Sequence, residues 1–241
     1  MVQSGQIPSQ PIAGTPAVAP RPPGRLAAVA FDMDGLLVDS EPLWFMAESA
    51  VMARLGAAWE PADQHALVGG SLGKTVEYLL AKAARPADAG LVGRWLTETM
   101  VELVSSRPLI MLPGTADLVA EVQAAGLPCA LVTSSEPAVA QAILARLDVR
   151  FDVVVCAADV AQTKPDPEGY LLAAAKLGAD PWRCIALEDS PNGVAAAEAA
   201  GYRVVAVPGV VPVPAIAGRV VLDTLAGVTL AELRDRTRLT G

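Results

Sequence analysis

Two aspartates stand two positions apart, directly after a short apolar segment near the N-terminus. Asp32 and Asp34 follow the apolar residues 27–31, and Gly35 comes next. Side chains two positions apart on a strand share a face, so both carboxylates can point into one small volume where the strand ends. Two carboxylates held together repel each other, and proteins use such pairs beside a cation or where protons are moved. The pair therefore predicts metal binding or acid–base chemistry, with Gly35 allowing the chain to turn.

Short apolar segments alternate with segments of helical periodicity along most of the chain. Proline near the first turn and glycine just past the last is the expected pattern of helix ends. Strand–helix–strand alternation predicts an α/β fold, a Rossmann-like three-layer core in which helices cover both faces of a parallel sheet. Strands are expected at 27–31, 128–132, 152–156, 184–188, 203–207 and, weakly, 219–222, and helices at 115–125, 137–147, 167–177 and 191–200.

Residues 41–107 interrupt this alternation. Pro42 opens a helical pattern, further helices are expected at 61–68, 74–84 and 88–105, and no strand pattern lies among them. An all-helical block after the first strand predicts an inserted cap domain. Its linkers would be Val38–Glu41, where Asp39 and Ser40 mark the hinge, and Ser106–Gly114. The α/β core domain would then comprise 25–40 and 108–241, and the proline-rich residues 1–24 would form a disordered tail.

Composition limits the partners of the protein. The 241 residues carry a net charge of −8, which disfavours nucleic acid, because phosphate backbones require clustered Lys and Arg. No apolar run is long enough to span a membrane, and no secretory signal is apparent. The three cysteines, each in a short apolar segment, favour buried reduced thiols in a cytoplasmic protein over a disulfide scaffold. Nothing in the sequence requires more than a monomer.

Polar side chains also follow three other expected strands. Ligands of open parallel sheets bind at the carboxyl ends of the strands. Each polar group has a simpler interpretation: the serines and threonine before Pro137 and the acidic pair before Pro191 fit helix N-caps, and Lys164 fits a solvated surface lysine. Their occurrence at the same ends of the strands favours one shared site. The groups are Thr133-Ser134-Ser135, Lys164-Pro165-Asp166-Pro167 and Glu188-Asp189-Ser190.

Taken together, four motifs resemble those of the haloacid dehalogenase superfamily, in the same order and over residues 26–240. The position of the helical block resembles the β-phosphoglucomutase-like subgroup, which carries a C1-type helical cap. That subgroup includes β-phosphoglucomutase and small phosphosugar phosphatases. The motifs are residues 31–42 (Phe-Asp-Met-Asp-Gly-Leu-Leu-Val-Asp-Ser-Glu-Pro), Val132–Ser135, Lys164–Pro167 and Leu187–Ser190.

The resemblance implies a mechanism for phosphoryl transfer. Asp32 would attack phosphorus to give an aspartyl-phosphate, and Asp34 would act as general acid and then as general base. Mg²⁺ would be held by Asp32, the backbone carbonyl of Asp34 and Asp189, with Glu188 as a neighbouring or alternative ligand. Phosphate oxygens would be held by Thr133, the Ser134 backbone N–H and Lys164.

Among the activities of that family, hydrolysis of small phosphomonoesters, sugar phosphates included, fits the sequence best. A general acid at Asp34 is not needed for a halide leaving group. The β-phosphoglucomutase pattern has a histidine and an arginine where this chain has Trp44 and Leu72. A phosphohexomutase is therefore the alternative, and a non-catalytic phospholigand-binding module a third hypothesis that the intact motifs disfavour.

Three cap residues keep open interpretations. Trp44 fits the lining of a substrate pocket as well as the core of the cap. Lys74 fits a surface lysine near a helix start better than a cation for the substrate. His65, the one histidine of the sequence, fits a partly exposed bystander.

Overall fold

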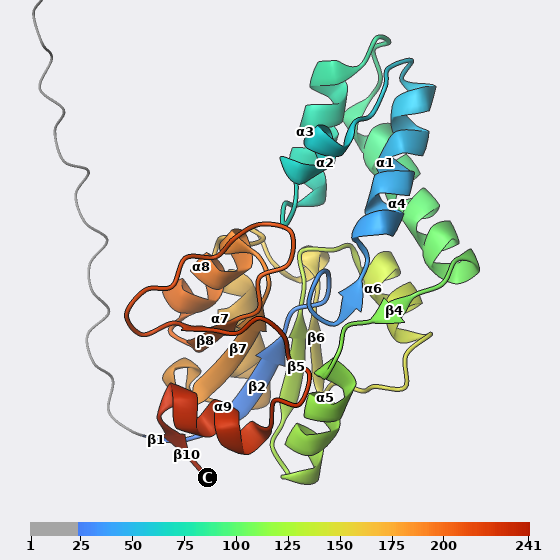
Figure 1. The fold of residues 1–241 in the computed structure, drawn as a ribbon. Helices are drawn as coiled ribbons and strands as arrows, with labels where there is room; N and C mark the ends of the chain where they lie inside the picture. The colour runs from blue at the N-terminus through green and yellow to red at the C-terminus, as the bar shows by residue number, and fades with distance from the viewer. Residues whose placement is uncertain (1–23) are drawn as a thin grey trace, which may run out of the picture.

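A central sheet of six parallel strands runs through the described part of the chain, residues 24–241 of the computed structural model (Figure 1). Its strands are β2 (Ala28–Phe31), β5 (Cys129–Val132), β6 (Val153–Val155), β7 (Cys184–Glu188), β8 (Arg203–Ala206) and β9 (Val220–Val221). Their spatial order is β6-β5-β2-β7-β8-β9. The central strand β2 pairs with both neighbours, with Ala30 opposite Ala130 and Ala186. All six predicted strands are present, with small differences at their ends.

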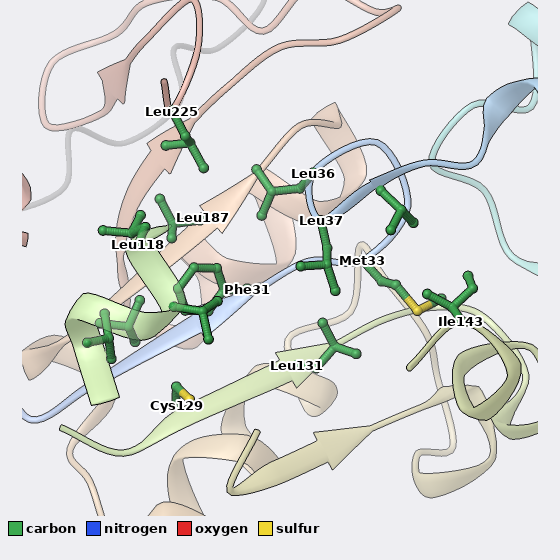
Figure 2. Close-up of a cluster of buried hydrophobic side chains, with 14 of the residues drawn as sticks. Phe31, Met33, Leu36, Leu37, Leu118, Cys129, Leu131, Ile143, Leu187 and Leu225 are labelled. Carbon is green, nitrogen blue, oxygen red and sulfur yellow. The ribbon is translucent and has the colours of Figure 1, made fainter. Parts of the chain in front are cut away.

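Alternation along β2 determines what packs on each face of the sheet. Ala28 and Ala30 face one cluster with α7 and α8, whereas Val29 and Phe31 face the other with α5, α6 and α9. Figure 2 shows Phe31 among larger aliphatic side chains of this second cluster. The two faces give the three-layer α/β core that the sequence predicted. The helices are α5 (Thr115–Ala124), α6 (Pro137–Leu144), α7 (Glu168–Leu177), α8 (Pro191–Ala200) and α9 (Leu230–Thr237).

Four helices form the block between β3 and β4, and Figure 1 shows it beyond one end of the sheet. Apolar side chains of α1, α3 and α4 meet in a cluster of their own, around Met52, Leu79 and Leu96. The third helix begins two residues before the predicted position, because the Ser71 hydroxyl caps it by accepting a hydrogen bond from the Lys74 N–H. The helices are α1 (Glu41–Arg54), α2 (Pro61–His65), α3 (Leu72–Lys82) and α4 (Ala89–Ser106).

The two linkers to this block pair with each other. β3 (Val38–Asp39) and β4 (Ile110–Met111) form an antiparallel ribbon, with Val38 opposite Met111. Arg146, which follows α6 in the core, makes a second connection to the block. Its guanidinium donates hydrogen bonds to the carbonyls of Val104 and Arg107 at the end of α4. The block is thus attached by a two-stranded hinge rather than by two independent linkers.

The two ends of the described chain lie side by side. β1 (Gly24–Arg25) pairs in parallel with β10 (Leu239–Thr240). Gly24, which we expected in the tail, therefore belongs to a strand, because its backbone pairs with Leu239. The rest of the predicted disordered tail, residues 1–23, lies outside the described residues. The three cysteines are buried and free, as the composition predicted.

Two short 3₁₀ turns and α9 were not expected from the sequence. The turns are Ala157–Asp159 and Pro181–Arg183. Among the described residues, no helix combines the length and the apolar character needed to cross a membrane.

Candidate active site

The strand order places the aspartates at the centre of the sheet edge. Asp32 directly follows β2, and its backbone N–H donates to the Leu187 carbonyl of β7 at 3.0 Å. Asp34 lies in a turn closed by the N–H of Gly35, which donates to the Val38 carbonyl at 2.9 Å. Gly35 has a φ of +84°, and a Cβ there would lie 2.1 Å from the Asp189 carboxylate. Glycine is therefore required by both the turn and the close approach of the second acidic segment.

Lys164 is the cation of this site. Its ammonium donates to Asp32 Oδ1 at 2.5 Å, to Glu188 Oε1 at 2.6 Å and to the Val132 carbonyl at 2.7 Å. The Tyr170 hydroxyl donates to the same Glu188 oxygen at 2.5 Å. Lys164 is buried, so it is no solvated surface lysine. All three ammonium protons have acceptors, the condition under which a buried charge is tolerated.

Three buried carboxylates gather around one small volume. Asp32, Glu188 and Asp189 each offer an oxygen, and these oxygens lie within 4.8 Å of one another. Glu188 Oε2 and Asp189 Oδ1 are buried and have no hydrogen-bond partner among the described residues. Buried carboxylate oxygens without partners are costly unless something else binds them, and hard oxygen donors suit Mg²⁺. The group therefore fits a divalent cation. Glu188 lies close enough to Asp32 and Asp189 to be a direct ligand of that cation.

Burial dominates the electrostatics of these groups. It raises the pKa of Asp32 to about 8, against the opposing effect of the Lys164 ammonium. Burial, together with the charge of Asp32, raises the pKa of Asp189 to about 9. Burial would by itself lower the pKa of Lys164, but Asp32 and Glu188 outweigh it, so the pKa lies above its usual value. Three carboxylates thus share one ammonium, an excess of negative charge that a bound cation would neutralise.

The second aspartate has a different environment. Asp34 Oδ1 accepts hydrogen bonds from Ser40 Oγ at 2.6 Å and Trp44 Nε1 at 3.1 Å. Its Oδ2 accepts from Ser135 Oγ at 2.7 Å and Thr133 Oγ1 at 3.3 Å. The Asp34 carboxylate is therefore not among the three grouped carboxylates, and it faces hydroxyls that can reverse their hydrogen bonds. Such surroundings suit a group that gains and loses a proton.

The loop after β5 supplies the hydroxyls. Thr133 Oγ1 also accepts from the Ser135 N–H at 3.0 Å, which orders the loop. Ser134 Oγ is buried without a hydrogen-bond partner among the described residues. A free hydroxyl on a ligand cavity is available to a ligand oxygen.

A cavity between the helical block and the sheet edge joins these groups. Its floor holds both aspartates and Lys164, and its walls come from α1, the α2–α3 loop, α3 and α4. The loop contacts the floor directly, since Asn192 Nδ2 donates to the Gly69 carbonyl at 3.0 Å. The lining residues are Asp32, Asp34, Glu41, Trp44, Glu48, Gln64, Leu67, Val68, Gly69, Gly70, Ser71, Leu72, Thr75, Thr97, Thr133, Ser134, Ser135, Glu136, Lys164 and Ser190.

The three cap residues whose interpretation the sequence left open lie in different environments. Trp44 is half-buried and lines this cavity, which agrees with the pocket interpretation. Lys74 is exposed and lines a neighbouring cavity that shares Ser134 and Lys164 with the first. His65 is exposed at the end of α2 and lines none of the described cavities.

Several residues that contact the aspartates or line the cavity were not singled out from the sequence. Ser135 lies inside a motif already noted, and Ser40 was assigned only to the hinge, so their positions carried a usable signal. Glu48 lies in α1 and Gln64 in the five-residue helix α2, and no spacing pattern singles out either residue. Only the packing of α1 and α2 over the sheet edge brings these two to the cavity.

The parallel sheet, the carboxylates at its edge and the inserted helical block define a Rossmann-like enzyme fold with a helical insertion over its site. The family model for haloacid dehalogenase-like hydrolases matches residues 26–201. The chain therefore belongs to this family of enzymes, in agreement with the resemblance of its motifs.

Known proteins extend the similarity over most of the chain. Hexitol phosphatase B of Escherichia coli (strain K12) is 38% identical over 191 residues, which cover 77% of this chain and 85% of that protein. A mutant CbbY from Rhodobacter sphaeroides, in complex with xylulose-(1,5)bisphosphate, superposes with a TM-score of 0.78 at 32% identity, covering 86% of this chain and 99% of that one. β-Phosphoglucomutase of Clostridium difficile shares the fold, with a TM-score of 0.74 at 22% identity over 88% and 97% of the two chains.

Proposed function

We propose that the protein is a Mg²⁺-dependent phosphatase that hydrolyses small phosphomonoesters, sugar phosphates among them, through an aspartyl-phosphate intermediate. The observation that carries this proposal is the paired arrangement at the cavity floor. Asp32 is held by a buried lysine beside two more carboxylates, while Asp34 lies apart among reversible hydroxyl partners. This arrangement supports attack by Asp32 and proton transfer by Asp34.

In the first step Asp32 attacks phosphorus, and the bond between phosphorus and the leaving oxygen breaks. Asp34 gives its proton to that oxygen, so the leaving group departs as an alcohol. The Trp44 indole N–H can only donate, so Oδ1 of Asp34 stays an acceptor and Oδ2 is the oxygen that holds the proton. Ser135 and Thr133, whose hydroxyls both donate and accept, can serve either state of Oδ2.

In the second step a water attacks the aspartyl-phosphate, and Asp34 takes the water proton as general base. The bond between phosphorus and the Asp32 oxygen breaks, which releases inorganic phosphate and regenerates the carboxylate. The Ser134 hydroxyl, which has no hydrogen-bond partner among the described residues, is available to the phosphate oxygens, and the ammonium of Lys164 supplies positive charge beside them. Proton transfer by a positioned side chain is typically worth about 10²–10⁴-fold in rate.

Asp32, Asp189 and Glu188 would hold Mg²⁺, with the Asp34 carbonyl as a further ligand. A bound Mg²⁺ offsets the repulsion between the carboxylates and a phosphate dianion and stabilises charge on the transferring group. The unpartnered oxygens of Glu188 and Asp189 support this assignment.

Hydrolysis is preferred over the mutase alternative because of the cap side of the cavity. Moving phosphate within a hexose requires binding a second phosphate in the cap, which calls for cations there. Among the described residues that line this cavity, the one Lys or Arg is Lys164, on its floor. The name of the hexitol phosphatase relative also points to hydrolysis of a sugar-alcohol phosphate.

The test uses purified protein, Mg²⁺ and p-nitrophenyl phosphate, with phosphate release as the readout. Asp32→Asn should abolish turnover, and EDTA should abolish it in the unchanged protein until Mg²⁺ is restored. Asp117→Asn, the same change on the exposed surface of α5, is the matched control and should keep full activity.

Turnover by Asp32→Asn, with a circular dichroism spectrum like that of the parent, would end the nucleophile assignment. Activity that persists in EDTA would contradict the metal site. A hexose phosphate that is isomerised without release of phosphate would instead indicate the mutase.

A further inference from the structure

The cap half of the cavity is acidic and hydroxylic. α1 contributes Glu41 and Glu48, α2 contributes Gln64, and α3 and α4 contribute Thr75 and Thr97. No Lys or Arg lies among these cap residues in the part of the chain that the structure describes. The leaving group of a substrate held at the floor would therefore meet hydrogen-bonding groups of the cap, whereas the cap lysine Lys74 lines the neighbouring cavity instead.

Glu48 is the most deeply buried of these groups. Glu48 is 4% exposed, and its Oε2 accepts a hydrogen bond from Trp59 Nε1 at 3.1 Å. Its Oε1 has no hydrogen-bond partner among the described residues. Burial, aided by the nearby charge of Glu41, raises the pKa of Glu48 to about 8. A carboxyl that retains its proton both donates and accepts, as a substrate hydroxyl does.

Gln64 is fixed by Glu41 beside it. Gln64 Nε2 donates to the Glu41 carbonyl at 2.7 Å and to Glu41 Oε2 at 2.9 Å. This leaves Gln64 Oε1 as an oriented acceptor, with no hydrogen-bond partner among the described residues. Glu41, Glu48 and Gln64, which we name the polyol wall, thus offer oxygen atoms held in place before a ligand arrives.

We propose that the polyol wall selects phosphomonoesters whose leaving group is an uncharged polyhydroxyl chain, and that it rejects sugar bisphosphates. The proposal rests on the proposed function and names the substrate class of that same site. Hydroxyls satisfy the free oxygens of the wall, whereas a second phosphate would lose its hydration with no cation to replace it. Sites that hydrogen-bond a substrate hydroxyl discriminate strongly against analogues that lack it.

The proposed substrate preference agrees with the name of one relative and differs from the bound ligand of another. One is named a hexitol phosphatase, and the other was solved with xylulose-(1,5)bisphosphate. The acidic cap half favours the first kind of substrate for this protein, a distinction that the shared fold does not make.

The experiment compares kcat/KM for a hexitol monophosphate, a hexose bisphosphate and p-nitrophenyl phosphate, each with Mg²⁺. The hexitol monophosphate should be preferred over the bisphosphate by on the order of 100-fold. Glu48→Gln, which keeps an acceptor for Trp59, should reduce that preference about tenfold, mainly by raising KM for the hexitol monophosphate. Glu102→Gln, the same change at an exposed position of α4 outside the described cavities, should leave the preference unchanged.

A second variant covers the case in which Glu48→Gln does not fold. Thr97→Arg adds a cation to the cap half and should raise kcat/KM for the bisphosphate about tenfold, since paired charges hold a phosphate. Equal use of the two sugar phosphates by the parent, or a preference unmoved by either variant, would overturn the proposal. Turnover of p-nitrophenyl phosphate reports on the proposed function separately, because that ester carries no hydroxyl chain for the wall to bind.

Discussion

Glu48 makes the free energy of unfolding depend on pH in a way that can be worked out from the structure. Its pKa rises from 4.5 to about 8 because the side chain is buried on α1, beside Glu41 and Trp59. The folded state therefore keeps a proton that the unfolded chain releases. Stability from this proton is fully present below the unfolded pKa and is lost as pH rises through the folded pKa.

The magnitude follows from the size of the shift. One pKa unit corresponds to about 1.4 kcal/mol, so the whole effect is roughly 5 kcal/mol at alkaline pH, and about 3 kcal/mol of it develops between about pH 5 and pH 8. Glu48→Gln removes the titrating group and keeps the hydrogen bond from Trp59. The free energy of unfolding of the variant should therefore rise relative to that of the parent protein by up to about 3 kcal/mol over this pH range.

Urea unfolding followed by circular dichroism, at several values of pH, measures the difference between the two proteins. Other groups with raised pKa values that do not interact with Glu48 occur in both proteins and cancel in that difference, so that Glu41 is the neighbour whose titration can also change. Glu102→Gln, at an exposed position, should show a constant difference from the parent. A constant difference for Glu48→Gln as well would refute the reasoning, because Glu48 would then titrate alike in the folded and unfolded chains.

Three further substitutions probe residues that lie beside the carboxylates of the site. Lys164→Met removes the cation between Asp32 and Glu188 and should lower kcat at least about 100-fold, measured by phosphate release; retained kcat would contradict its place at the phosphate. Trp44→Phe removes the N–H donor to Asp34 and should lower kcat about tenfold with KM nearly unchanged, whereas a change confined to KM would indicate substrate contact alone. Gly193→Ala places a Cβ 1.8 Å from Glu188 Oε2 and should reduce the free energy of unfolding by about 2 kcal/mol in urea titrations. The control Gly73→Ala, whose Cβ would meet no atom closer than 4.0 Å, should stay within about 0.5 kcal/mol of the parent.

The α/β core could be predicted from the sequence because its signals are local. Apolar runs marked the strands of the central sheet, since a strand buried on both faces has few polar residues, and proline and glycine marked the ends of the helices between them. The same local signals missed α9, a helix of eight residues that are mostly charged or polar. They also placed Gly24 in the tail, because its pairing with Leu239 depends on the opposite end of the chain.

The candidate site was likewise predictable from the sequence only in part. Asp32, Asp34, Thr133, Ser134, Lys164, Glu188 and Asp189 could be named in advance, because each follows a strand of a parallel sheet and such ends converge at one edge. The resemblance of the motifs already implied a division of roles among them, but how the side chains are arranged needed the structure. The Asp34 carboxylate turns toward Ser40, Trp44 and Ser135, whereas Glu188 joins Asp32 and Asp189.

The sequence by itself determined the sheet and which residues lie at its edge, because strand patterns and motif spacing are properties of neighbouring residues. Only the tertiary structure decided what faces those residues across the cavity. Glu48 and Gln64 carry no spacing signal, and they reach the cavity because α1 and α2 pack over the sheet edge. Their burial and their unpartnered oxygens arise from contacts between segments far apart in the chain, and such contacts set the chemistry of the cap half.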